Sequence, residues 1–390
     1  MNPRIKLIIT LLVCLMLTSV CSAAETTIKD SRATPEYWLS RTSNGDEVLL
    51  TTRQISKLNA QILAKDKYAA DLTKYPSVVS ADKVKEMLKE TWKEDERNNS
   101  LVKGDVAVRY AVTIQRANIR LLPQAWDGDK YDDLQGTAID PAEAVAVLLD
   151  SADKSFVFVQ SRYYMGWIEK SKLAFTTRET WLTYVKSKDF LIVTDNKKTI
   201  NVEGQDVLFQ MGAMIPVVDA ESHDDIWVMR LPTAVEGKLK EVNVNIAMND
   251  EGINKGFLAC TNNNFIRQAF KFLGNNYGWG GLYDSVDGSA FIQDIYRSMG
   301  INIPRDTSRQ EYCMPLFATL ADVGTVDYSK ILKSAPTGSL FLKNRQAMMK
   351  LGQDDDGMPI IIYSSYYAHK VVVADVRSVG NITSICYYGN

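Results

Sequence analysis

The sequence predicts an α+β protein in which a short helical segment and two small antiparallel β-barrels precede a mixed domain. Three observations support this fold class. Residues 25–104 contain polar stretches with helix-type apolar spacing. Residues 105–257 contain short alternating runs separated by Gly, Asp and Pro, which is typical of antiparallel barrels. Residues 258–390 contain two helical patterns followed by strand patterns, the order expected of an α+β domain.

Bulk composition limits the classes of partner. The 390-residue chain is long enough for several domains, and its 46% hydrophobic and 24% charged residues are ordinary for globular proteins. A net charge of −2 gives no electrostatic footprint for nucleic acid or an anionic membrane. His223 and His369 are the two histidines of the chain. This scarcity restricts acid–base chemistry, because histidine is the usual general base.

Residues 1–24 are predicted to be an export signal. A basic start is followed by the apolar run Leu7–Leu17 and by the small residues at positions 21–24. The run is short for a transmembrane helix, and no later stretch is long and apolar enough to span a bilayer. Cys21 raises the alternative of a lipoprotein, although Val20 is bulkier than a lipidation site favours. We expect an exported protein that is periplasmic or associated with the cell envelope.

The remaining cysteines do not indicate a disulfide framework or a metal site. Cys260, Cys313 and Cys386 are an odd number, so one bridge with one free thiol and three buried free thiols are both open. The chain has no Cys-x-x-Cys pair and no His-rich spacing. We therefore expect no zinc site and no cofactor.

The helical segment, residues 25–104, contains two predicted helices. Thr51 is placed to cap a helix that continues through Leu58 and Ile62, and Val84–Trp92 is the second helix. Together they predict a small helical cap.

The first barrel is predicted over residues 105–178. Its Asn118–Pro123 and Ser161–Ile168 segments resemble the opening and closing strands of bacterial SH3-like barrels. The second barrel, residues 179–257, is predicted from β-pattern alone, and Lys238–Val244 could instead be a linking strand. The predicted strands of this region are Val106–Ile114, Ala144–Leu149, Phe156–Gln160, 167–168, Phe190–Val193, Met214–Val218 and Ile226–Leu231.

The last domain, residues 258–390, begins with two predicted amphipathic helices, Asn264–Leu273 and Ser289–Met299. Four strands are expected after them, at Gly338–Leu342, Ala347–Leu351, Pro359–Tyr363 and Lys370–Val376.

A dense motif lies at the start of the second helix. Residues 277–281 read Tyr-Gly-Trp-Gly-Gly, residues 287–289 read Asp-Gly-Ser, and residues 304–305 read Pro-Arg. This order resembles the core of NlpC/P60 cell-wall cysteine peptidases, in which Asp-Cys-Ser opens the helix. The resemblance implies a papain-like fold for the domain. It also covers the N-terminal segment, whose sequence around Thr51 is similar to that of the stabilising segment ahead of some NlpC/P60 domains.

The three catalytic positions of the family are replaced in this chain. The resemblance places the cysteine nucleophile at Gly288, the histidine base at Gln346 and the orienting residue at Tyr363. Glycine has no nucleophile, and neither glutamine nor tyrosine serves as a base at neutral pH. Loss of one position would suggest a single exchange, whereas loss of three predicts a catalytically inactive protein.

Other residues do not obviously replace the missing groups. Ser289 adjoins the vacant position, but a serine nucleophile needs an activating base. Cys260 and Cys313 do not match the nucleophile position and are equally consistent with small buried hydrophobes. Neither histidine has an evident partner.

The resemblance also implies a peptide-binding surface. In members with SH3-like barrels, the Asp before the cysteine holds the free amine of a peptidoglycan stem peptide, and the first barrel contributes an aromatic residue. Those positions here are Asp287 and either Tyr163 or Tyr164. Structural alternatives remain: Asp287 is also suited to cap its helix, Trp279 to pack the glycine turn, and an arginine to tie its loop. The candidate binding residues are Asp287, Ser289, Tyr163, Tyr164, Trp279, Arg305 and Thr307.

The sequence therefore predicts an exported, inactive NlpC/P60-type protein that binds peptidoglycan stem peptides or a cell-wall partner. One alternative is an active endopeptidase that cleaves γ-D-glutamyl-diamino-acid bonds with an unexpected nucleophile. The other is an envelope scaffold whose pocket has closed.

Overall fold

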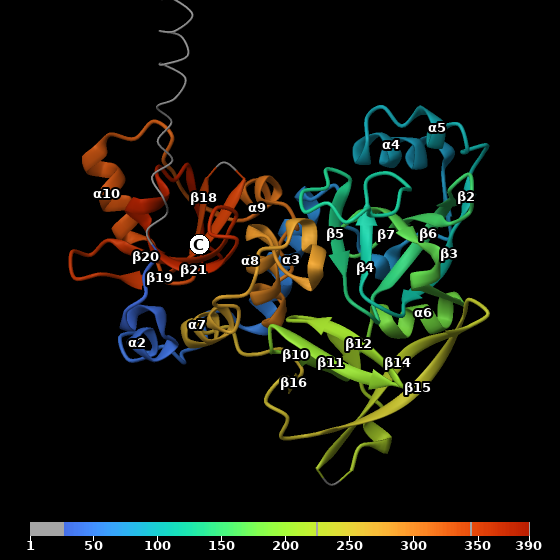
Figure 1. Cartoon of the computed structure of the whole chain (residues 1–390), viewed down its shortest axis with the longest axis horizontal. Helices are drawn as coiled ribbons and strands as arrows, with labels where there is room; N and C mark the ends of the chain where they lie inside the picture. Colours follow the sequence, from blue (N-terminus) through green and yellow to red (C-terminus); the bar gives the residue numbers. More distant parts are fainter. Residues whose placement is uncertain (1–26, 224, 344, 390) are drawn as a thin grey trace, which may run out of the picture.

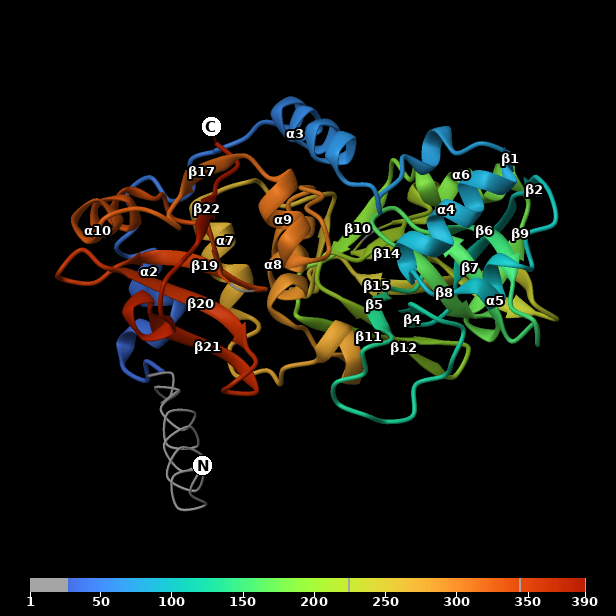
Figure 2. The same cartoon turned by 90° about the horizontal axis from the view of Figure 1, so that it is seen from above.

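The computed structural model describes residues 27–223, 225–343 and 345–389, so the predicted export signal lies outside the described residues. Within these ranges no helix combines the length and apolar character needed to cross a membrane. Figures 1 and 2 show two lobes, with helices α8 (Gly288–Ser298) and α9 (Thr307–Cys313) between them. The C-terminal sheet forms one lobe and the β-rich region forms the other.

The N-terminal segment is shared between the two lobes. Helix α3 begins after Thr51 as predicted, because the Thr51 hydroxyl accepts from the Gln54 amide and the Gln54 side chain accepts from Thr51 in return. Helices α2 and α3 pack on the C-terminal domain, and helix α4 packs on the first barrel. The segment is therefore a strap across both lobes. Its elements are η1 (Ser31–Ala33), α2 (Pro35–Leu39), α3 (Thr52–Lys65), η2 (Leu72–Lys74), β1 (Val78–Val79), α4 (Ala81–Thr91) and α5 (Glu96–Asn99).

The first barrel forms most of a nine-stranded sheet in the order β14-β15-β9-β3-β6-β7-β8-β4-β5. Alternation along these strands buries apolar residues on both faces, and Trp167 and Phe158 are fully buried. Its elements are β2 (Val106–Ala107), β3 (Arg109–Thr113), β4 (Ala117–Arg120), β5 (Gln135–Ile139), β6 (Ala144–Asp150), β7 (Phe156–Gln160), β8 (Met165–Glu169), η3 (Lys170–Lys172), β9 (Leu173–Thr176) and α6 (Arg178–Val185).

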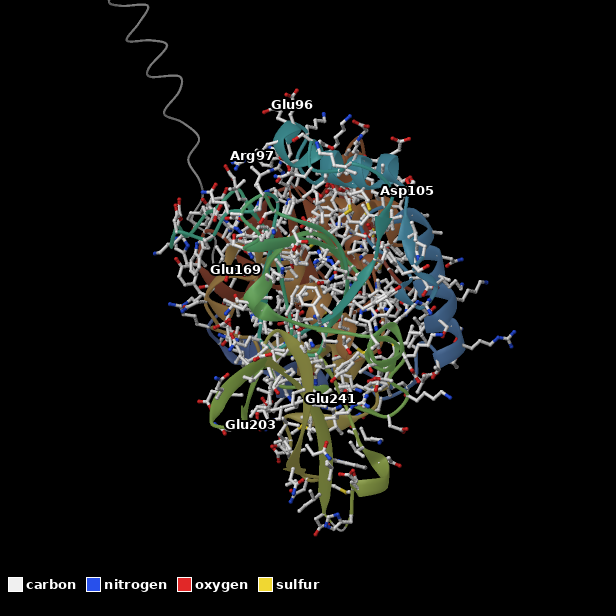
Figure 3. The ribbon with its side chains drawn as sticks, turned by 90° about the vertical axis from the view of Figure 1, so that its right-hand side faces the viewer. Glu96, Arg97, Asp105, Glu169, Glu203 and Glu241 are labelled. Carbon is white, nitrogen blue, oxygen red and sulfur yellow. The ribbon has the colours of Figure 1, made fainter. Side chains whose placement is uncertain are left out.

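The region of the second predicted barrel has a separate apolar core. Lys238–Val244 lies in β15, which pairs with β14 over ten residues and reaches β9 at Lys238. An ion pair of 2.6 Å joins Lys240 of β15 to Glu203, which lies between β11 and β12. Figure 3 labels Glu203 and, on β15, Glu241. The elements are β10 (Phe190–Val193), β11 (Lys197–Val202), β12 (Gln205–Gln210), β13 (Met214–Pro216), η4 (Asp219–Glu221), β14 (Ile226–Val235), β15 (Lys238–Ala247) and β16 (Ile253–Lys255). Its assignment as a barrel stays a prediction.

The C-terminal domain packs helices against a six-stranded sheet of order β17-β22-β18-β19-β20-β21. Both predicted helices and all four predicted strands are present, whereas α9, α10, the edge strand β17 and the strand β22 were not expected from the sequence. Helix α8 is buried along its whole length between this sheet and the barrel. The elements not yet named are α7 (Asn262–Phe270), η5 (Trp279–Asp284), β17 (Leu316–Thr319), α10 (Thr325–Ser334), β18 (Leu340–Lys343), β19 (Gln346–Gln353), β20 (Pro359–Ser365), β21 (Lys370–Asp375), η6 (Val376–Val379) and β22 (Ser384–Cys386).

A buried ionic network joins the two lobes. Arg297 of α8 contacts Asp140 at 3.1 Å and Glu143 at 3.3 Å in the barrel, and Asp294 at 3.4 Å on its own helix. Arg116 contacts Asp140 at 3.1 Å. Three carboxylates thus face two guanidinium groups in this network. Burial raises the pKa of Asp294 to about 7, against the opposing effect of Arg297. Protonation of Asp294 leaves two anions for two cations.

We expect the wild type to lose stability as the pH rises from 5 to 8, and the Asp294→Asn variant to lose less. A carboxyl whose pKa is raised on folding binds its proton more tightly in the folded state, so stability falls as pH rises from its unfolded to its folded pKa. The pKa of about 7 predicts a loss of roughly 2–3 kcal/mol in the wild type across this range. Urea denaturation of both proteins at the two pH values measures the difference. Parallel pH profiles would contradict the assignment.

Candidate active site

A groove of about 370 Å³ lies where the start of α8 meets the start of β19 and the edge of the barrel. The barrel, the glycine turn before α8 and the loop before α9 each contribute a wall. The residues that line it are Leu121, Asp133, Gln135, Gly136, Tyr164, Tyr277, Trp279, Gly280, Asp287, Gly288, Ser289, Arg305, Asp306, Thr307, Ser308, Arg345 and Gln346.

The glycine turn forms the wall next to the barrel. Gly280 has φ +57° and Gly281 has φ +85°, a conformation that glycine adopts without strain. A Cβ at Gly280 would lie 2.5 Å from the Gln135 side chain, because the turn packs directly on β5. The Gln135 amide fixes this contact by donating to the Gly280 carbonyl over 3.0 Å. Close backbone packing therefore requires glycine here, and the Gly280 amide donates to Asp287 Oδ2 over 3.0 Å.

Gly288 is the first residue of α8, the place where a helix N-terminus would favour a thiolate. A Cβ built at this position would lie 2.5 Å from Nε2 of Gln346. The same amide nitrogen donates to the Ala347 and Ser364 carbonyl oxygens over 3.2 and 3.1 Å. The structure thus brings together two of the three replaced positions, and the Gln346 amide occupies the space beside Gly288.

Tyr363, the third replaced position, is fully buried. Its side chain belongs to the apolar cluster of Phe341 and Met348, which is separate from the cluster that contains α8. The structure therefore does not place Tyr363 among the residues that line the groove.

Asp287 is held by five donors. Oδ1 accepts from the Ala290 amide at 2.8 Å, the Ser289 hydroxyl at 3.1 Å and Arg305 Nη1 at 3.0 Å. Oδ2 accepts from the Gly280 amide at 3.0 Å and Arg305 Nη2 at 2.8 Å. A carboxylate offers about four acceptor positions. Asp287 therefore caps α8 and anchors Arg305, with its acceptor capacity already used.

The Asp287–Arg305 pair is the electrostatic centre of the groove wall. Arg305 also donates to the Thr137 hydroxyl at 2.7 Å and to the Ser289 hydroxyl at 2.8 Å, so it links the loop before α9 to the barrel. Burial acts to raise the pKa of Asp287, but Arg305 and the hydrogen bonds outweigh it, so this pKa lies below its ordinary value. Burial acts to lower the pKa of Arg305, and Asp287 raises it above the ordinary value. Both groups are charged at neutral pH.

The two candidate tyrosines, Tyr163 and Tyr164, lie in different surroundings in the structure. Tyr164 lines the groove, whereas Tyr163 points to the network between the lobes, where its hydroxyl donates to Glu143 over 2.5 Å. Trp279 lines the groove and donates from Nε1 to the Asp132 carbonyl over 3.1 Å. Thr307 lines the groove too, and its hydroxyl donates to the Arg345 carbonyl over 2.9 Å.

The thiols and imidazoles lie elsewhere. Cys260, Cys313 and Cys386 are buried and unpaired by disulfide bonds, which selects the second of the two expected arrangements. Burial raises their pKa values to about 12, 11 and 12, respectively. His369 Nδ1 lies 3.3 Å from the Tyr131 hydroxyl, and His223 Nδ1 lies 2.9 Å from the Glu221 carbonyl. Across the described residues, no group of three or more His, Cys, Asp or Glu is placed to hold a metal ion.

Sequence reasoning missed Gln135, Thr137 and Arg345. Gln135 and Thr137 hold the glycine turn and Arg305 through contacts that join distant parts of the chain. Arg345 has φ +67°, which puts an exposed arginine at the start of β19 beside Gln346. Alternation along β5 could have suggested that Gln135 and Thr137 share a face, but not what they bind.

The arrangement of the site, in which a helix starts in a groove between an antiparallel sheet and a small β-barrel, agrees with two family models. Residues 122–169 match the family model of the SH3 domain of SH3b1 type, and residues 274–358 match the model of the NlpC/P60 family. The chain thus carries an SH3-like domain and an NlpC/P60 domain, and the predicted α+β class and family resemblance are confirmed. The NlpC/P60 fold indicates a protein of the cell-wall peptidase type.

Solved structures support the same fold. An NlpC/P60 endopeptidase from Photobacterium damselae subsp. piscicida is 16% identical, with a TM-score of 0.56, and the match covers 93% of this chain and 88% of that one. An NlpC/P60 family protein from Bacillus cereus is 17% identical, with a TM-score of 0.52, over 72% of this chain and 100% of that one. A search of curated proteins found no significant match.

Proposed function

We propose that this protein is exported and binds peptidoglycan stem peptides in the groove without hydrolysing them. The observation that carries the proposal is Gly288 at the first turn of α8, with the Gln346 amide in the space next to it. A cysteine peptidase needs a thiolate there and a base within hydrogen-bond distance.

The groove offers no replacement pair of nucleophile and base. Among the described residues that line it, none is cysteine or histidine. Ser289 is 7% exposed, and its hydroxyl donates to Asp287 while accepting from Arg305. A hydroxyl next to a guanidinium and a low-pKa carboxylate lacks the base that serine nucleophiles require.

The alternative of an active cysteine endopeptidase would have to use Cys313 or Cys260. Burial raises the pKa of both thiols, which suppresses the thiolate, and neither residue lines the groove. The structural support therefore favours binding over cleavage.

Binding remains geometrically feasible because the groove is open. Gln346 occupies the place of the nucleophile, an observation that favours the alternative of a scaffold with a closed pocket. However, a volume of about 370 Å³ remains around it. Exposed Arg345 at one edge suits the carboxylates that a stem peptide carries. We therefore favour the ligand-binding function.

We expect the purified protein to bind the tetrapeptide L-Ala-γ-D-Glu-diaminopimelate-D-Ala in calorimetry and to leave it intact in mass spectrometry. The control is Arg345→Ala, which removes the exposed cation and is expected to weaken binding about tenfold. Cleavage that persists after repurification and in independent preparations would overturn the inactive assignment. Absence of heat at high peptide concentration would favour the closed scaffold.

A further inference from the structure

A second cavity opens beside the groove. Its volume is about 420 Å³, and Tyr277 lines both spaces, so the two cavities adjoin at this ring. Four of its six lining side chains are aromatic, counting the imidazole. The lining residues are Lys130, Tyr131, Asn276, Tyr277, Tyr283 and His369.

Three separate segments bring rings together at this cavity: Tyr131 and Tyr277 line it, and Tyr366 packs against both. The loop between β4 and β5 supplies Tyr131, the turn before α8 supplies Tyr277, and the loop between β20 and β21 supplies Tyr366. The Tyr366 ring lies 5.0 Å from that of Tyr131 and 5.8 Å from that of Tyr277, between centroids. A contact that joins the barrel to the C-terminal domain through aromatic rings creates a continuous aromatic surface.

Much of this surface faces solvent. Tyr283 is 49% exposed, Tyr366 40% and Tyr367 69%. Folding normally buries large rings, and contiguous exposed rings mark interaction sites. The Tyr283 hydroxyl donates to the Gly128 carbonyl over 3.0 Å, and its ring packs edge-on against Trp126 at 4.9 Å. The ring is therefore held in place before any ligand arrives, which lowers the entropy cost of binding.

The polar groups of the cavity are neutral or basic. None of the described residues that line it is acidic. Asn276 offers an amide, and the Tyr131 hydroxyl and His369 ring lie 3.3 Å apart at the edge. Flat apolar faces beside a few hydrogen-bonding groups match the pyranose ring, which presents C–H groups on its faces and hydroxyl or acetamido groups at its rim.

We propose that this aromatic cavity is a saccharide subsite, which binds the N-acetylated sugar to which the stem peptide is attached. The proposal rests on the proposed function of the neighbouring groove. The shared wall at Tyr277 puts the sugar next to the peptide, as a covalent sugar–peptide conjugate requires.

The state of Asp287 agrees with such a ligand. The five donors on Asp287 already use its acceptor capacity, so the amine of the free tetrapeptide gains no ion pair there and adds little to binding. In a sugar-linked stem peptide the amino end is acylated and uncharged. The groove and the aromatic cavity together thus fit a peptide whose amino end continues into a sugar.

Calorimetry with three probes tests the subsite: the free tetrapeptide, the same tetrapeptide joined to its disaccharide, and N,N′,N″-triacetylchitotriose. We expect the disaccharide-peptide to bind at least about tenfold more tightly than the free peptide, and the trisaccharide to bind without any peptide. The ratio of the two peptide affinities is the readout.

Variants locate the effect. Tyr366→Ala and Tyr283→Ala should bring the ratio close to one, whereas Tyr366→Phe keeps the ring and should preserve most of it. Tyr366 packs on the lining rings of Tyr131 and Tyr277. Tyr312→Ala is the matched control, because Tyr312 is a 70% exposed tyrosine on α9 that lines neither cavity, and it should leave the ratio unchanged.

The outcomes separate the two proposals. Equal affinities of the wild type for both peptides would overturn the saccharide subsite while leaving peptide binding intact. So would a fall of the affinity ratio in Tyr312→Ala as large as that in Tyr366→Ala. Equal affinities for the trisaccharide and the disaccharide-peptide, with no binding of the free peptide, would overturn the proposed function and support the subsite. Self-association in sedimentation that Tyr366→Ala abolishes would assign the aromatic surface to a second copy of the chain and overturn the subsite.

Discussion

Replacement of Arg305 by alanine is expected to destabilise the protein by about 3–5 kcal/mol, because it leaves the Asp287 carboxylate buried without its cation. The Arg305 side chain is 4% exposed and that of Asp287 is 15% exposed, so water does not take the place of the guanidinium. Thr137 and Ser289 lose a hydrogen bond as well. We expect Arg305→Ala to lose stem-peptide binding together with stability.

Two further variants test whether the loss of stability in Arg305→Ala comes from the buried Asp287–Arg305 pair. Arg305→Lys keeps the charge but not the paired hydrogen bonds to both carboxylate oxygens, so an intermediate loss is expected. Arg377→Ala removes a surface arginine that is 50% exposed and ion-paired with Asp375, and should cost less than about 1 kcal/mol. Urea unfolding monitored by tryptophan fluorescence measures all three. Similar losses in Arg305→Ala and Arg377→Ala would show that the buried pair has no special role.

Local sequence signals predicted the elements that frame the groove. The spacing of Phe291, Ile292 and Ile295 identified α8 to within one residue, since this helix presents an apolar face to the sheet. Asp287 could be recognised as a cap because Asp is favoured immediately before a helix. Both signals depend on residues a few positions apart, which the sequence displays directly.

Contacts between distant segments were not predictable in the same way. Nothing in the sequence around Arg305 indicates that it pairs with Asp287 and Thr137, which lie 18 and 168 residues away. The resemblance left Tyr163 and Tyr164 as equal candidates, and only the structure shows that Tyr164 lines the groove while Tyr163 contacts Glu143. The aromatic cavity is likewise assembled from three loops whose proximity follows from the docking of the two lobes.

The Gly288→Cys variant is expected to gain a thiol that reacts with iodoacetamide in the folded protein. Gly288 is the first helical residue of α8, where the helix dipole and the first amides lower a thiol pKa. The three thiols of the described residues are buried, and their raised pKa values keep them protonated at pH 8. Native labelling should therefore be faster than in the wild type by on the order of a hundredfold, at the new cysteine.

Gln346 determines how well that cysteine fits. The Cβ of a residue at 288 lies 2.5 Å from the Gln346 amide nitrogen, so the side chain of Gln346 must move in Gly288→Cys. The double variant Gly288→Cys/Gln346→Ala removes this conflict and should recover any stability lost in the single variant. In Gly288→Cys/Gln346→His, labelling should become fast at a lower pH than in Gly288→Cys/Gln346→Ala, because an imidazolium stabilises the thiolate.

Peptide mapping after native labelling, repeated from pH 5 to pH 9, checks both statements. Gly288→Ala provides the unreactive control for the change in backbone and volume. If the new cysteine reacts no faster than Cys260, Cys313 and Cys386, then the start of α8 is closed to solvent and the groove does not admit a ligand. That result would weaken the peptide-binding proposal at its structural basis, whereas rapid labelling would mean that the protein has kept the architecture of a nucleophile site and lost only its chemical groups.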